Sequence, residues 1–144
     1  MAKQQSGTDD LRRLIRDLGK LPAETRKELR PVLRKAGTRA RTRAKANASW
    51  SRRIPGAIRL SVSFTKRRPG VALRVDQRRA PHARALENLG KQGTFRHPLF
   101  GDRERWVSQR AKPFLFSAAQ AEWRPINADI AAAVSTAARK HGFR

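Results

Sequence analysis

One apolar stripe through residues 22–49 constrains the fold most strongly. Pro22 suits the first position of a helix, where its missing N–H is not needed. Pro31 lies within the pattern, where a proline costs about 3 kcal/mol and kinks a helix, so two abutting helices are the alternative to a single bent one. We predict one long, bent helix from about Pro22 to Ser49. Its stripe recurs at the spacing of one helix face and narrows to alanine: Leu29, Val32, Leu33, Ala36, Ala40 and Ala44.

A shorter amphipathic helix is expected before it. Thr8 is a suitable cap, acids follow in the first turn, and Gly19 is a suitable stop. Its apolar face consists of Leu11, Leu14, Ile15 and Leu18. Residues 8–49 are therefore predicted to be helical, and residues 1–7 to form a flexible polar tail.

Two segments alternate in hydrophobicity with a period of two, which is typical of half-buried strands. The turn residues Pro69 and Gly70 separate them, so they predict an antiparallel hairpin with one face on the core. Ala83 to Leu86 is expected to add a short third strand at the edge, which places the sheet within residues 57–88. The alternating side chains are Ile58, Leu60, Val62 and Phe64 in the first segment, and Val71, Leu73 and Val75 in the second.

A second apolar stripe predicts a long C-terminal helix over residues 113–141, with a kink at Pro125. Its members are Ala119, Trp123, Ile126, Ile130, Ala133, Val134 and Ala137. At 144 residues the chain has the length of one domain. The expected class is α+β: a small antiparallel β-sheet, made of the hairpin and the short third strand, packed by the long bent N-terminal helix and the long C-terminal helix.

Residues 89–112 are expected to form a contact loop between these elements. Loops of about 20 residues are uncommon in compact domains and are usually functional or disordered. This one is too apolar for a solvated linker, because it carries Phe95, Leu99, Phe100 and Trp106. We expect some of these side chains to be exposed in the monomer and covered in an assembly.

The same region resembles a known family. The run ARALENLG, then GTFRHPLFG, then a Trp and AKPFLFSAA, resembles the head-to-tail joining or tail completion proteins of long-tailed bacteriophages. Leu86, Glu87 and Gly90 match that family's turn after a short strand. Pro113, Phe114 and Leu115 match its Pro-Phe-Leu step into the last helix. With the basic helix and two strands upstream, the resemblance spans roughly residues 9–141.

The resemblance implies a structural virion protein of the phage neck, without catalysis. Such proteins form a ring, usually six-fold, around the DNA channel, and they contact the neighbouring head-completion and tail-tube proteins. The expected location is thus the virion, in its neck or tail, after assembly in the host cytoplasm. Contacts between subunits or between rings are expected at Phe95, Leu99, Phe100, Trp106, Pro113 and Phe114.

The charge of the chain implies an acidic partner. Lys and Arg number 34 against 11 Asp and Glu, a net charge of +23, and such a charge attracts polyanions. The alternative is a solvated basic surface that keeps the protein soluble. No groove-reading motif accompanies the cations, so any DNA contact is expected to be non-specific. The candidates to face DNA or an acidic protein are Arg39, Arg41, Arg43, Arg67 and Arg68.

This charge supports a second hypothesis, a non-specific nucleic-acid-binding protein of ribosomal or nucleoid-like type. Neither hypothesis involves catalysis, and the residue patterns that enzymes use are missing from the sequence. The chain has no Cys, its three His lack metal-ligand spacing, and it contains neither a Gly-rich phosphate loop nor a nucleophile elbow. We therefore expect no enzyme activity, cofactor or metal. No apolar run approaches the roughly 18 residues that span a membrane, so no membrane partner is expected.

Overall fold

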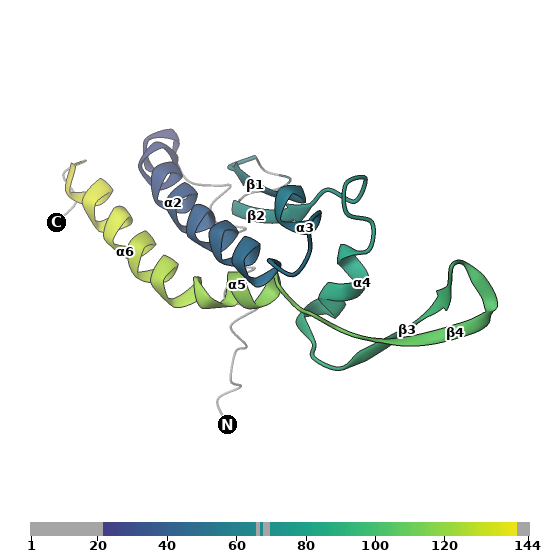
Figure 1. Ribbon diagram of the computed structural model, residues 1–144. Helices are drawn as coiled ribbons and strands as arrows, with labels where there is room; N and C mark the ends of the chain where they lie inside the picture. The colour runs from purple at the N-terminus through teal and green to yellow at the C-terminus, as the bar shows by residue number, and fades with distance from the viewer. Residues whose placement is uncertain (1–21, 66, 68–69, 141–144) are drawn as a thin grey trace, which may run out of the picture. The chain divides into compact units, whose positions relative to one another are not determined.

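The computed structural model describes residues 22–65, 67 and 70–140. The predicted flexible tail, the short helix after it, Arg68 and His141 lie outside these residues. Within the described part, the chain forms five α-helices and two antiparallel sheets of two strands each (Figure 1). The expected mixture of helices and small antiparallel sheets is thus confirmed, although several of its details differ.

Contacts divide the chain into two compact units, and each is described by itself. Unit 1 comprises Met1–Thr38, Leu60–Ala72 and Arg124–Arg144. Unit 2 comprises Arg39–Arg59 and Leu73–Trp123. Each unit has its own cluster of buried apolar side chains.

Helix α2 spans Ala23–Asn47 and contains Pro31, so one continuous helix forms here rather than two. Glu24 lies in its first turn and Lys45 in its last, where each charge is favoured by the helix dipole. The predicted stripe is its buried face, with only Val32 partly exposed. The predicted pairing of the two alternating segments is confirmed as well, because β1 (Ile58–Ser63) pairs with β2 (Gly70–Val75).

The core of unit 1 joins the first half of α2 to α6 (Trp123–Lys140), two helices that lie side by side in Figure 1. Gly37 marks a close approach, since a Cβ built on it would lie 2.5 Å from Leu60 Cδ1 and 2.8 Å from Val71 Cγ1. Lys140 Nζ also lies 2.8 Å from Glu28 Oε1. The buried members of this core are Leu29, Leu33, Phe64 and Ile130.

The predicted single C-terminal helix is wrong in two respects. Helix α5 begins at Phe116 and ends at Ala121, and α6 begins after a break at Glu122. Pro125 is the third residue of α6, where a missing N–H costs no intrahelical hydrogen bond. The proline therefore lies in the first turn of a new helix and does not kink a continuous one.

The predicted third strand is also wrong, because Ala83–Glu87 is helix α4. Ala83 and Leu86 are buried while the two residues between them are exposed, which is helical spacing. A 3₁₀ turn, η1 (Asn88–Gly90), follows directly. With α3 (Ile54–Ala57), these elements surround the core of unit 2, whose buried members are Ala44, Ala48, Ile54, Ala57, Ile58, Ala80, Ala83, Leu86, Phe114 and Ala118.

The contact loop is not irregular. Strands β3 (Thr94–Leu99) and β4 (Asp102–Arg110) fill most of it and form the second antiparallel sheet. In Figure 1 this hairpin extends away from α4 and α5 of the same unit. Regular pairing satisfies the backbone of this long segment, which a loop would leave to water.

Candidate interaction surface: the β3–β4 hairpin

The hairpin is anchored at its base. The Ala111 amide donates to the Gly93 carbonyl at 2.7 Å, and the Lys112 amide donates to the Leu86 carbonyl at 2.9 Å. Phe95, in the first half of β3, packs against the core of unit 2. Unit 2 therefore fixes where the hairpin begins.

Beyond the base, the hairpin is largely open to solvent. Along β4 every residue except Val107 is exposed, and Trp106 retains 49% of its surface. A two-stranded ribbon in water is marginally stable, and its unpaired edges are ready templates for another chain. The ribbon is thus an exposed arm whose backbone edges have no partner strand within the sheet.

The tip of the hairpin presents a phenylalanine. Leu99 pairs with Asp102, so Phe100 and Gly101 form a two-residue turn. Both have positive φ, 51° and 83°, as in the type I′ turns that suit hairpins. Such turns favour Asn-Gly, because a larger side chain in the left-handed region costs about 1 kcal/mol or more. Phe100 is nevertheless 100% exposed, so this position combines backbone strain with an unburied aromatic ring.

Trp106 is held beside the tip by contacts along the ribbon. The pairing shifts between Pro98 and Leu99, so residues 103–105 form an irregularity in β4. Trp106 Nε1 donates to the Arg103 carbonyl at 2.8 Å, and the Arg96 guanidinium lies 5.9 Å from the indole centroid. An Arg over a Trp face is an attractive pair. The indole is thereby oriented although it is half exposed.

The resemblance-derived turn and step are brought together behind the hairpin. The Glu87 carboxylate accepts three backbone N–H groups: Phe114 at 2.7 Å, Leu115 at 2.9 Å and Phe116 at 2.7 Å. These amides open α5, whose first N–H groups have no intrahelical acceptor. A negative charge is also favoured at a helix N-terminus. Glu87 therefore fixes α5 to the end of α4.

Gly90 lies against Phe116, at the capped start of α5. Its φ is +77°, and a Cβ at this position would lie 2.6 Å from Cγ of Phe116, so only glycine fits. Leu86, the remaining residue of the turn, is buried in the core of unit 2. The resemblance pointed to all three residues, but nothing in the sequence indicates that a carboxylate of α4 caps the start of α5.

We expect Glu87→Ala to destabilise the protein strongly. The change leaves three amides without their acceptor, at a cost of about 2–4 kcal/mol. For a chain of this size that corresponds to a fall in Tm of about 5–15 °C. Thermal unfolding followed by circular dichroism measures it, with Glu104→Ala, an exposed acid on the hairpin, as the matched control. Equal Tm values for the two variants would contradict the capping role.

The other expected contact residues are placed differently. Leu99 and Pro113 are half-buried, whereas Phe114 is fully buried in the core of unit 2. The Phe114 side chain therefore belongs to the core, where its ring and that of Trp50 form a T-shaped pair at a centroid distance of 6.4 Å. Of the six expected contacts, Phe100 and Trp106 have the exposure that a docking role requires.

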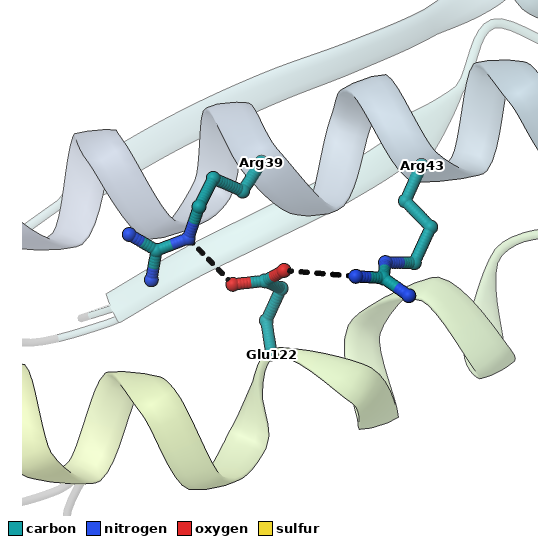
Figure 2. A network of polar contacts seen from close by, with 3 residues as sticks. All are labelled: Arg39, Arg43 and Glu122. Atoms are coloured by element: carbon teal, nitrogen blue, oxygen red, sulfur yellow. Dashed lines mark hydrogen bonds and ion pairs between the residues drawn. The ribbon is translucent and has the colours of Figure 1, made fainter.

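Two of the candidate basic residues have a partner within unit 2 (Figure 2). Arg39 Nε donates to Glu122 Oε2 at 2.7 Å, and Arg43 Nη2 lies 3.8 Å from Glu122 Oε1. Glu122 is buried, and its position at the break between α5 and α6 aims its carboxylate at α2. Arg39 and Arg43, on the basic face of α2, thus make contacts within the fold of unit 2. Arg67 is exposed, and Arg41 is partly exposed.

Two negative findings accompany this geometry. Among residues 22–65, 67 and 70–140, no group of three His, Asp or Glu side chains is placed to hold a metal ion. None of the helices in the same stretch has the length and apolarity needed to cross a membrane.

Comparisons with protein-family models, with curated proteins and with solved structures gave no match to this chain.

Proposed function

We propose that the protein is a structural component of a bacteriophage neck, which joins the DNA-filled head to the tail as a ring around the DNA channel. The proposal starts from the resemblance of the turn and the Pro-Phe-Leu step to head-to-tail joining and tail completion proteins. The Glu87 carboxylate connects the matched turn to the matched step, because its three hydrogen bonds hold the start of α5 at the end of α4.

The observation that carries the proposal is Phe100 at the hairpin tip. A fully exposed ring on a strained backbone lowers the stability of the isolated chain, and strained positions that persist are concentrated at functional sites. Such a tip suits a neck component, because the ring is exposed while the protein is free and is covered when the protein docks in the particle. The hairpin is then the arm that contacts a neighbour.

The basic charge suits the same location. A subunit beside packaged DNA gains from non-specific attraction to phosphate, and +23 supplies it. Head-completion and tail-tube proteins are the proposed protein neighbours of the ring. In this proposal the protein binds and positions these neighbours, and it catalyses no reaction.

A null mutant of the parent phage tests the proposal. We expect cells infected with phage lacking this chain to accumulate DNA-filled heads and free tails, which electron microscopy distinguishes from joined particles. Adding the purified protein to the lysate should restore joining. Normal joined particles in the null mutant would contradict the proposal.

The net charge favours a second candidate function, a non-specific nucleic-acid-binding protein. The hairpin argues against it as the main role. The only charged residues of the distal ribbon, residues 97–109, are Asp102, Arg103, Glu104 and Arg105, so this ribbon is neutral. An arm made for phosphate would concentrate cations at its tip instead.

A further inference from the structure

A stripe of cations runs along one side of helix α2. This basic stripe consists of Lys27, Arg34, Arg41 and Lys45. The last three follow Lys27 by 7, 14 and 18 positions, which are close to whole numbers of helical turns, so all four lie on one side of the helix. Arg41 is partly exposed, and the other three are exposed. Because α2 is one continuous helix, the basic stripe extends over about 27 Å.

The four cations of the basic stripe are unpaired in the part of the chain that the structure describes. Neither a hydrogen bond nor an ion pair engages any of their side chains there. Arg39 and Arg43, in contrast, follow Lys27 by 12 and 16 positions, so they lie on another side of α2, where they contact Glu122 (Figure 2). The basic stripe is thus a set of charges that the fold does not neutralise.

The charge of α2 is strongly one-sided. Nine Lys and Arg stand against two Glu in this helix. Glu24 lies in the first turn, before the basic stripe begins, and Glu28 lies 2.8 Å from the ammonium of Lys140. No acid therefore offsets the four cations from within their own side of the helix.

The residues between these cations indicate what kind of partner the side fits. They are Pro31 and Thr38, both exposed, so the side offers no aromatic or large aliphatic side chain. Protein interfaces depend on such anchors at their centre and are depleted in Lys. A DNA duplex, in contrast, carries about one negative charge per 1.7 Å of its axis, so phosphates are available along the whole length of the basic stripe. Charge complementarity thus favours DNA as the partner.

We infer that the basic stripe of α2 binds the phosphates of double-stranded DNA. This assignment rests on the proposed function for the source of the DNA, and it makes the basic stripe the surface of each subunit that faces the channel. Contacts to phosphate position a protein on DNA but carry no sequence information directly, so the stripe accepts any sequence. Arg39 and Arg43, which the sequence offered as candidates, are held by Glu122 instead.

The salt dependence of DNA binding tests this assignment, measured by fluorescence anisotropy with a duplex of random sequence. Each phosphate contact contributes about −0.9 to the slope of log K against log salt. A stripe variant with Lys27→Gln, Arg34→Gln, Arg41→Gln and Lys45→Gln should therefore have a slope smaller in magnitude by about 3, and should bind at least about a hundredfold more weakly at about 50 mM salt.

The matched control loses the same four charges from exposed positions elsewhere, so it has the same net charge as the stripe variant. Its substitutions are Arg78→Gln, Arg84→Gln, Arg103→Gln and Arg105→Gln. We expect its slope to stay within about 1 of the wild-type slope. Equal losses in the two variants would overturn the inference, because net charge alone would then determine binding. The absence of any DNA binding by the wild-type chain would overturn it as well.

Two further variants keep the test independent of folding, which circular dichroism monitors. Lys27→Gln with Lys45→Gln changes only the two ends of the basic stripe, and the slope should still fall in magnitude by about 2. Arg34→Lys with Arg41→Lys keeps every charge and should bind DNA like the wild-type chain. If the stripe variant binds DNA like the wild-type chain while the null phage still lacks joined particles, the stripe does not face DNA and the proposed function stands. If the null phage joins normally, the proposed function itself fails.

Discussion

Replacing Phe100 by Asn is expected to abolish the joining of heads to tails while leaving the chain folded. The change removes the exposed ring and creates Asn-Gly, the pair that a two-residue turn with positive φ prefers. Relief of strain should stabilise the hairpin by about 1 kcal/mol. Loss of an interface anchor, in contrast, costs about 2–4 kcal/mol in each contact, or roughly 30- to 1,000-fold in affinity.

The measurement is the infectious titre of the null phage supplied with each variant, together with the Tm of the purified chains. Phe100→Leu, which keeps the tip apolar, is the matched control and should retain most of the joining. The double change of Phe100 and Trp106 to Ser should behave like Phe100→Asn, because both side chains are exposed in the isolated chain. Full titre with Phe100→Asn would show that the hairpin tip takes no part in the contact. Unfolding of the variant would assign Phe100 to the fold instead.

The second large effect concerns salt. We expect any binding of DNA by the purified protein to weaken by at least about a hundredfold between about 50 and 200 mM salt, because it depends on released counterions. Discrimination between DNA sequences should stay below about tenfold, since no groove-reading motif occurs in the chain. Fluorescence anisotropy with duplexes of different sequence measures both quantities. Tight binding that persists at 200 mM salt, or a strong preference for one sequence, would contradict an electrostatic interaction.

The regular part of the fold could be predicted from side-chain periodicity. In α2 the stripe is long enough to determine a helix despite Pro31, whose cost the packed face outweighs. In β1 burial alternates from Ile58 to Val62, so one face of this strand is more buried than the other. Where buried apolar residues recur with the period of a helix or of a strand, the sequence pattern predicts that helix or strand.

The hairpin could not be predicted in this way. Its strand β4 is exposed on both faces, so no apolar alternation marks it, and its turn is Phe-Gly instead of Asn-Gly. The segment from Ala83 was misassigned for a related reason, since a helix of five residues shows little more than one turn of pattern. Exposure of some of the side chains Phe95, Leu99, Phe100 and Trp106 is nevertheless expected from the sequence, because a segment with so few regular neighbours cannot bury them all, and Phe100 and Trp106 are the exposed ones.

The cap by Glu87 lies beyond sequence reasoning for another reason. Its carboxylate and the amides that it accepts are 27 to 29 positions apart in the chain. No periodic signal connects such positions, and the resemblance alone drew attention to both. The pairing of Arg39 with Glu122 over 83 positions is similar, since the scarcity of acids predicts that Glu122 has a basic partner without saying which one.

Cryo-electron microscopy of free tails from the null phage, incubated with the purified protein, tests the neck assignment most directly. The predicted result is one closed ring of this chain at the head-proximal end of each tail. Bare tails in the presence of protein that coats released DNA would contradict the assignment and favour a non-specific nucleic-acid-binding protein.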